Sequence, residues 1–338
     1  MKPLVSSFAS QPFGPTHFLA TLRWVLLLAL LILPQMLLAD SWQVKVGAQS
    51  HNKGHQAIAF LPNEIWIHAG DSVTWTLETD EIHTVTFLVP GQIRPPFIVG
   101  CPGVSPNGSS FDNSTCVTSG VLVRPKVFTV NFPSAGNFKL VCLVHRNMSG
   151  VVHVLDQSAL LPHGHEFYEE EGEHERHTLL SDTRHEHNEI TSEESKNVSA
   201  GLGEVSATPG GQQTLAVMRF MEETKVVHVG DTVEWGNPDS TTPHTITFGG
   251  GPDPANPVLP SPDVTLDADG ARHAILNSPT DVSHSGFIVP APQEKTGSPQ
   301  NPLTVTRFRV TFPKAGEFPY RCVLHDNLGM MGKVIVLP

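Results

Sequence analysis

Apolar and polar residues alternate along short stretches of the chain, and glycine, proline or aspartate separates these stretches. Val73 and Trp75 lie two positions apart in one of them, and Val233 and Trp235 repeat that spacing later. A period of two is typical of β-strands with one buried face, and the segments between them indicate turns. The pattern predicts an all-β fold, with no long amphipathic helix outside the N-terminal segment and a polar central linker.

The chain contains an internal repeat. Residues 60–75 align without a gap with residues 220–235, at an offset of 160, and residues 128–145 align with residues 308–325, at an offset of 180. The second copy therefore has the longer insertion between its halves. Two copies of one unit predict two domains of the same fold, at residues 40–156 and 205–338.

The segment between the copies, residues 157–204, differs in composition. Between Asp156 and Lys196 there are twelve acidic and three basic residues. The segment also contains His163, His165, His174, His177, His185 and His187. One interpretation is a solvated, flexible tether, since such a charge run cannot form a core. The other is weak, exchangeable metal binding through His-X-His pairs and carboxylates, and the two are compatible.

The N-terminal segment has the pattern of a signal peptide. Arg23 precedes an apolar run that Pro34 interrupts, and Ala39 ends an acceptable cleavage site. The unbroken run is short for a spanning helix, which needs roughly 20 apolar residues. We expect residues 1–39 to be a signal peptide cleaved near Ala39, and the protein to be periplasmic or secreted. If the segment stays uncleaved, it is the only expected membrane contact.

Charge and cysteine content narrow the function further. The net charge of −12 argues against a nucleic-acid partner, which would require a basic face. Cys101 and Cys116 lie in a stretch rich in glycine, proline, serine and asparagine. In an oxidising compartment we expect a Cys101–Cys116 disulfide, the alternative being two free thiols.

The other two cysteines begin clusters of metal donors. Cys322, His325 and Met330 lie within nine residues, and Cys142 begins a shorter version of the same cluster. One thiolate, one imidazole and one weak axial thioether are most of the ligand set of a blue-copper site, which also needs a second imidazole. His83 and His244 are the candidates, because each follows the repeated Gly-Asp-Xaa-Val-Xaa-Trp strand and starts an alternating run.

With these motifs, both repeats resemble the cupredoxins, the small blue-copper proteins of the plastocyanin and azurin type. The second loop, CVLHDNLGMMGKVIV, has the donor spacing of plastocyanin and pseudoazurin, and Pro243 precedes His244 as in plastocyanin. The first loop, CLVHRNMSGVVHV, has the shorter spacing of amicyanin, and Ile82 replaces the proline. The resemblance covers both domains, but neither the N-terminal segment nor the linker.

The resemblance implies two tandem Greek-key β-sandwiches, each with one type 1 copper, and a ligating histidine whose solvent-facing edge serves as the electron exit. Met331 is adjacent to Met330, but the spacing favours Met330. All eight ligand positions are filled, which argues against a domain that has lost its metal. His68 and His228 also recur, and we expect them to be structural. Carried over by position, the ligands are His83, Cys142, His145 and Met148, then His244, Cys322, His325 and Met330.

The sequence favours an electron carrier over a copper enzyme. Multicopper oxidases and copper nitrite reductases have histidine beside a type 1 cysteine, whereas the neighbours here are Val141, Leu143, Arg321 and Val323. The His-X-His pairs that an oxidase needs in its domain strands occur only in the linker. We therefore predict an exported, non-enzymatic protein that passes electrons to a redox partner protein. Copper buffering or delivery through the linker is the alternative, and the unequal loops predict two inequivalent coppers.

Overall fold

The computed structural model describes residues 39–95, 101, 103–190, 197–251, 258–290 and 304–338, with no side-chain description for residues 182–190. The expected signal peptide falls almost entirely outside these residues. Within them, no helix combines the length and apolar content needed to cross a membrane.

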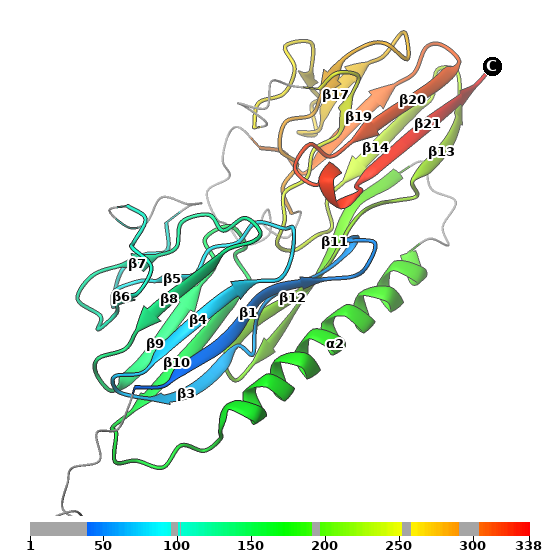
Figure 1. Cartoon of the computed structure of the whole chain (residues 1–338). Coiled ribbons are helices and arrows are strands. Elements are labelled where there is room, and N and C mark those ends of the chain that lie inside the picture. Colours follow the sequence, from blue (N-terminus) through cyan, green and yellow to red (C-terminus); the bar gives the residue numbers. More distant parts are fainter. Residues whose placement is uncertain (1–38, 96–100, 102, 191–196, 252–257, 291–303) are drawn as a thin grey trace, which may run out of the picture. The chain divides into compact units, whose positions relative to one another are not determined.

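The described chain is built from strands, one long helix and one short 3-10 turn (Figure 1). The first repeat contains β1 (Ser41–Gln49), β2 (His55–Leu61), β3 (Glu64–His68), β4 (Ser72–Leu77), β5 (Thr86–Phe87), β6 (Ser109–Ser110), β7 (Val117–Thr118), β8 (Val127–Asn131), β9 (Gly136–Val141) and β10 (Ser149–Leu155). The second contains β11 (Asn197–Thr208), β12 (Gly211–Met221), β13 (Thr224–His228), β14 (Thr232–Gly236), β15 (Thr247–Phe248), β16 (Thr265–Leu266), β17 (Arg272–Ile275), β18 (Ser283–His284), β19 (Arg307–Thr311), β20 (Gly316–Arg321), η1 (Asp326–Leu328) and β21 (Met331–Leu337). Helix α2 (His165–Ile190) separates them.

The strands form three sheets. One sheet of 11 strands runs through both repeats in the order β16-β17-β19-β14-β11-β12-β2-β1-β4-β8-β6. The sheets β3-β10-β9-β5-β7 and β13-β21-β20-β15-β18 belong to the first and second repeat. Each repeat is thus a β-sandwich, called here the first and the second sandwich, and the all-β prediction is confirmed.

Alternation along the strands explains the two cores. In β4 the inward side chains are Val73, Trp75 and Leu77, all buried, and in β14 Val233 and Trp235 are buried in the same way. The turn before each of these strands requires glycine, because Gly70 and Gly230 have φ angles of 99° and 91°. The repeated Gly-Asp motif is therefore a turn that sets the register of the next strand.

Strand β12 joins the two sandwiches. It pairs antiparallel with β11 and, along its first half, antiparallel with β2 of the first sandwich. Its residues Ala216 and Met218, together with Leu328 from the second sandwich, belong to the buried core of the first sandwich. The two repeats consequently share both a sheet and apolar packing, so we expect little freedom between them.

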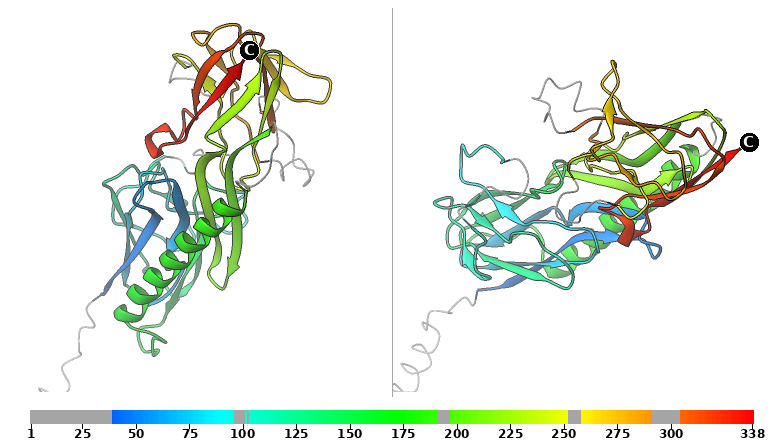
Figure 2. Two further views of the ribbon diagram at one scale, coloured as in Figure 1. Left: turned by 90° about the vertical axis from the view of Figure 1, so that its right-hand side faces the viewer. Right: turned by 90° about the horizontal axis from the view of Figure 1, so that it is seen from above.

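Helix α2 lies along the shared sheet across β1, β2 and β12, and Figures 1 and 2 show it from three sides. Its buried residues Leu179 and Leu180 pack on Leu61 and Leu215 of the sheet. The Tyr168 hydroxyl accepts a hydrogen bond of 3.0 Å from the backbone N–H of Trp66. Residues 165–181 are therefore a docked helix, and the expectation of a flexible tether is wrong for them.

The second sandwich also begins earlier in the sequence than the expected domain boundary. Strand β11 begins at Asn197 and pairs in parallel with β14, as β1 pairs with β4 in the first sandwich. A boundary after residue 204 therefore falls inside this strand. Its irregular alternation, with Gly201 and Gly203, explains why the pattern did not reveal it.

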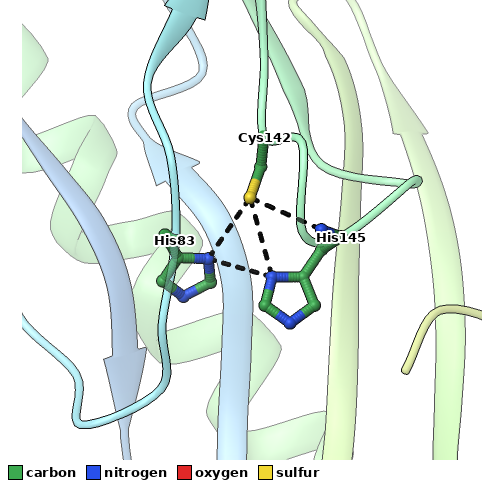
Figure 3. Close-up of side chains that lie close together, drawn as sticks. All are labelled: His83, Cys142 and His145. Carbon is green, nitrogen blue, oxygen red and sulfur yellow. Dashed lines mark hydrogen bonds between the residues drawn. The ribbon is translucent and has the colours of Figure 1, made fainter. Parts of the chain in front are cut away.

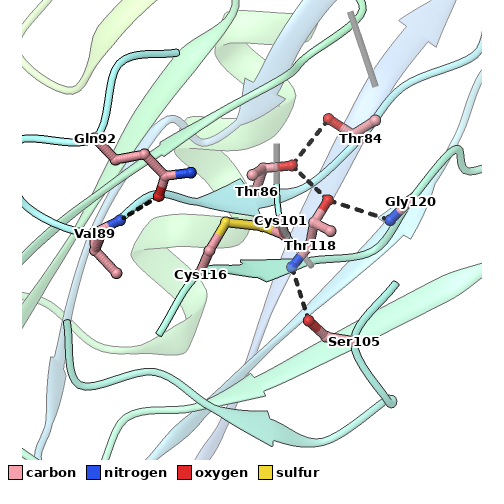
Figure 4. The surroundings of a disulfide bond; sticks show 9 residues. All are labelled: Thr84, Thr86, Val89, Gln92, Cys101, Ser105, Cys116, Thr118 and Gly120. Atoms are coloured by element: carbon pink, nitrogen blue, oxygen red, sulfur yellow. Dashed lines mark hydrogen bonds between the residues drawn. A yellow bond between two sulfur atoms is a disulfide. The ribbon is translucent and has the colours of Figure 1, made fainter. Parts of the chain in front are cut away.

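The cysteine-bearing loop of the first sandwich supports the strand that follows His83. A disulfide joins Cys101 to Cys116, the pair expected from the sequence (Figure 4). Just after it, the Thr118 hydroxyl lies 2.8 Å from the Thr86 hydroxyl of β5. The backbone N–H of Leu122 donates a 2.7 Å hydrogen bond to the carbonyl of His83. The loop thus fixes the backbone that carries this histidine.

Candidate metal centres

Three predicted ligands converge at one end of the first sandwich. His83 precedes β5, Cys142 directly follows β9, and His145 lies in the loop before β10; all three are buried. The Cys142 Sγ atom is 3.8 Å from His83 Nδ1 and 3.7 Å from His145 Nδ1, and the two Nδ1 atoms are 3.1 Å apart. Figure 3 shows these atoms facing one another.

The second sandwich repeats this arrangement. Cys322 Sγ lies 3.9 Å from His244 Nδ1 and 3.4 Å from His325 Nδ1, and the two nitrogens are 3.2 Å apart. Among the described residues, these two His–Cys–His groups are the ones whose donor atoms could hold a metal ion. A metal with bonds of about 2.0–2.3 Å and angles of about 100–130° between them separates its donors by roughly 3.1–3.9 Å, so both groups fit one.

The threonine that follows His83 or His244 forms hydrogen bonds that orient the cysteine of the same group. The backbone N–H of Thr84 points at Cys142 Sγ at 3.4 Å, and its hydroxyl accepts a 2.7 Å hydrogen bond from the N–H of Leu143. Thr245 makes the same contacts with Cys322 Sγ and with the N–H of Val323, at 3.4 and 2.9 Å. The repeated His-Thr dipeptide therefore orients the sulfur as well as supplying an imidazole.

The environment of each cysteine favours the thiolate. Burial by itself would raise the pKa of Cys142, but hydrogen bonds from His145 and His83 lower this pKa well below its usual value. Burial would likewise raise the pKa of Cys322, but the charges of His325 and His244 and their hydrogen bonds together lower it well below its usual value. Since the thiolate is the form that binds metals, both sulfurs are prepared as ligands.

Each predicted axial methionine is buried beside its cysteine. Met148 and Met330 are both fully buried, each in the same core cluster as the cysteine of its loop. The backbone N–H of Cys142 donates to the Met148 carbonyl at 3.0 Å, and that of Cys322 to the Met330 carbonyl at 3.1 Å. Met331 is 55% exposed. Of the two neighbouring methionines, Met330 is the one on the side of the cysteine.

Two glycines leave room for the first histidine of each group. A Cβ atom on Gly47 would lie 2.8 Å from His83 Nε2, and one on Gly201 would lie 2.2 Å from His244 Nε2. Both glycines have positive φ angles, of 65° and 77°, and both lie where the register of their strand shifts. A bulge in β1 and one in β11 thus form equivalent cradles, which sequence reasoning missed.

The outer nitrogens of the imidazoles have different partners in the two groups. Asp239 Oδ2 lies 3.3 Å from His244 Nε2, and both side chains are fully buried. Burial lowers the pKa of His244, but Asp239 and Cys322 raise it to about 9. Within the described residues, His83 Nε2 has no hydrogen-bond partner, and the residue equivalent to Asp239 is Thr79. Only the second group therefore has a carboxylate behind its first histidine.

The second histidines share one carboxylate. Glu81 lies 3.4 Å from His145 Nε2 through Oε1 and 3.6 Å from His325 Nε2 through Oε2. Burial would raise the pKa of Glu81, but the charge of His325 and the contact with His145 lower it to about 2. Burial lowers the pKa of His145, while Cys142 and Glu81 raise it to about 10. Glu81 is thus an ionised, buried group between the two sites.

Both second histidines are closed off from solvent. His145 is fully buried and His325 is 3% exposed, because the two sandwiches meet at these rings. The solvent-facing histidine edge implied by the resemblance is therefore wrong for both sites. We call this contact region between the two sandwiches the seam. There, the Asn147 side-chain amide also donates to the carbonyl of Ser240 at 3.3 Å.

Arg94 caps the first ligand loop. Its guanidinium donates hydrogen bonds to the backbone carbonyls of Cys142, His145 and Arg146. It is the only side chain of the described residues recorded in contact with all three carbonyls, and nothing in the local spacing pointed to it.

The remaining histidines have other surroundings. His163 stacks on Phe167 and His165 on Trp42, with ring centroids 3.6 and 3.8 Å apart. His185 and His187 lie outside the described side chains. His68, expected to be structural, has its Nε2 atom 2.9 Å from the carbonyl of Ala159.

Comparison with known proteins agrees with this geometry. The chain is 28% identical over 110 residues to plastocyanin of Synechococcus sp. (strain JA-2-3B'a(2-13)), a match that covers 32% of this chain and 57% of the relative. Over this segment the chain is therefore similar to a plastocyanin, one of the proteins that its ligand loops resemble. It spans little more than half the length of this curated cupredoxin relative, and no family model matches.

Solved structures similar to the chain include amicyanins. A reduced amicyanin variant matches with 17% identity and a TM-score of 0.23, covering 34% of this chain and 82% of the amicyanin. A copper(I) form of another variant matches with 16% identity and a TM-score of 0.24, with the same coverage.

Proposed function

We propose that this chain is a cupredoxin that acts as an electron-transfer protein, with one type 1 copper in each sandwich. The ligands would be the eight residues expected from the sequence: His83, Cys142, His145, Met148, His244, Cys322, His325 and Met330. The observation that carries the proposal is the pair of buried His–Cys–His groups whose three donor atoms face one another. Two imidazoles and a thiolate suit both Cu(I) and Cu(II), and the copper would supply one-electron chemistry there.

The flanking residues support a carrier over an enzyme. Val141, Leu143, Arg321 and Val323 stand beside the two cysteines, so no imidazole leads from either sulfur to a further copper. Export through residues 1–39, and a redox partner protein, are parts of the same proposal. Because His145 and His325 face the seam between the sandwiches, we place the partner's contact away from these two rings.

Copper titration tests this function. Metal-free protein should take up about two equivalents of Cu(II), and an intense visible thiolate-to-copper absorption should grow until the second equivalent is bound. Saturation at one equivalent, or copper binding without this absorption, would exclude the proposal. Incubation with oxygen or nitrite should give no turnover.

The carboxylate behind His244 should lower the reduction potential of the second site. A carboxylate that accepts the outer N–H of a ligating imidazole makes the ring a stronger donor, which favours Cu(II). We expect Asp239→Asn to raise the potential of the second site by roughly 60 mV, equal to about a tenfold change in a one-electron equilibrium. The first site should change little.

A matched control is Asp80→Asn. Asp80 lies in the equivalent loop of the first sandwich, but its carboxylate pairs with Lys53 at 2.8 Å and accepts from the Gln49 amide. Its removal should leave the potential of the second site unchanged. Equal shifts in Asp239→Asn and Asp80→Asn, measured by spectroelectrochemical titration, would mean that the contact with His244 is not the cause.

A further inference from the structure

The carboxylate of Glu81 lies against both His–Cys–His groups. Each of its oxygen atoms faces a different ring, Oε1 facing His145 in the first sandwich and Oε2 facing His325 in the second. The Glu81 side chain is 6% exposed, so water screens these contacts little. A charge placed at one ring is therefore felt by the other through a group that touches both.

The first sandwich holds Glu81 in this position. Its backbone N–H donates to the hydroxyl of Thr79 at 3.1 Å, and that hydroxyl donates in turn to Gln56 at 2.6 Å. In the second sandwich the equivalent residue is Thr241, whose hydroxyl contacts Asn147 and Thr214 at the same seam. The repeat is therefore asymmetric here, with one acidic residue serving two rings.

A role in packing alone does not account for this arrangement. Burying a carboxylate costs free energy unless it is paired, and well-packed apolar groups at a seam are often as stable as a buried ion pair. The seam already has the continuous β2–β12 pairing and the packing of Leu328. The carboxylate instead contacts the outer nitrogens of the two rings whose Nδ1 atoms face the cysteines.

We propose that Glu81 is a positioning residue that couples the two metal centres. This rests on the proposed function, since it takes copper to be bound at His145 and His325. If a one-electron oxidant such as ferricyanide oxidised copper held at one site, the added positive charge would strengthen the electrostatic attraction between that ring and the Glu81 carboxylate. The carboxylate then stabilises the other ring less, so oxidation of one site opposes oxidation of the other.

The coupling is measured by comparing the whole protein with its single-site variants. Cys142→Ser leaves only the second site. We expect the equilibrium constant for oxidising this site to be at least tenfold larger in the variant than in the whole protein with Cu(II) already at the first site. That change is about 59 mV for a one-electron couple. In Glu81→Gln, which keeps the shape but removes the negative charge between the two rings, this difference should fall at least threefold.

A matched control separates Glu81 from a general effect of charge. Glu78→Gln removes a carboxylate from the same segment, where no contact with an imidazole is recorded in the described part of the chain. It should leave the coupling unchanged. If Glu78→Gln reduces the coupling as much as Glu81→Gln does, or if neither reduces it, the proposal is wrong.

A second readout needs no copper. In the Zn(II)-loaded protein, nitrogen-15 NMR should show the Nε2–H protons of both His145 and His325 shifted downfield, and Glu81→Gln should move both signals upfield. If only one signal moves, the carboxylate is not shared and the proposal fails. If Glu81→Gln does not fold, the wild type decides, since equal potentials in the whole protein and in the single-site variants contradict the coupling.

These outcomes separate the coupling from the proposed function. A protein that takes up no type 1 copper but shows both shifted Nε2–H signals would contradict electron transfer while retaining the shared carboxylate. A protein with two type 1 coppers and no coupling would contradict the role of Glu81 and leave electron transfer standing.

Discussion

Replacing Cys142 by serine should remove one type 1 copper and leave the other. The hydroxyl of serine does not ionise near neutral pH and is a hard donor, so the first site loses the ligand that gives the intense absorption. Cys322→Ser should do the same at the second site. We expect each variant to bind about one equivalent of type 1 copper, with roughly half of the visible absorption.

The two variants control each other, because each leaves one His–Cys–His group intact. Their spectra should also differ, since only the second group has a carboxylate behind its first histidine. Their sum should reproduce the spectrum of the whole protein. If either variant loses both coppers, or if either keeps two, then the two groups are not the two separate copper sites proposed.

Gly201→Ala should abolish ordered copper binding at the second site. The new Cβ would lie 2.2 Å from His244 Nε2, a distance that no packing allows, so the ring must move away from Cys322. The backbone adds strain, because φ at Gly201 is 77° and left-handed backbone costs about 1–2 kcal/mol for alanine. We expect at least a 10–100-fold loss of copper affinity at this site, the scale on which misplaced ligand positions act.

Gly230→Ala separates the collision from the strain. Gly230 also has a positive φ, of 91°, but a Cβ there would meet nothing within 4 Å. Gly230→Ala should lower the free energy of unfolding by about as much as the backbone strain in Gly201→Ala does, and it should leave both coppers in place. If Gly230→Ala loses the second copper as readily as Gly201→Ala, backbone strain rather than contact with His244 is responsible.

Much of the architecture could be predicted because it is encoded locally. The Cys-X-X-His spacing places Cys142 and His145 in one short loop, and the alternation that starts at His83 aims one face of the next strand into the core. Because the second copy has the same spacing and alternation, the same reasoning predicts Cys322, His325 and His244. Strand period and ligand chemistry were sufficient to predict these residues without knowledge of how the sandwiches pack.

The helix was harder to predict because its buried face is not uniformly apolar. Tyr168, Gly172, Glu175 and Leu179 follow one another at helical spacing toward the sheet, but two of them do not count as hydrophobic. Burial raises the pKa of Glu175 to about 7, and the Gln213 amide donates to it at 2.8 Å. Because the helix is rich in acidic residues, its composition did not reveal the face that packs on the sheet.

Glu81 depends on packing between repeats, which no pattern within one repeat encodes. The sequence signal that could have revealed Glu81 is a difference between the two copies just before the first histidine of each group. Glu81 aligns with Thr241, and Thr79 aligns with Asp239. A charged residue next to a predicted ligand, present in only one copy, indicates that the two sites differ in their outer contacts.

The most direct test of two type 1 centres is the paramagnetic resonance spectrum of the oxidised, copper-loaded protein, recorded together with its total copper content. The account predicts about two coppers per chain, all with the small hyperfine splitting of a copper–thiolate bond, and two resolvable sets of parameters. One copper per chain, or a signal with the large splitting of copper held by nitrogen and oxygen alone, would contradict it.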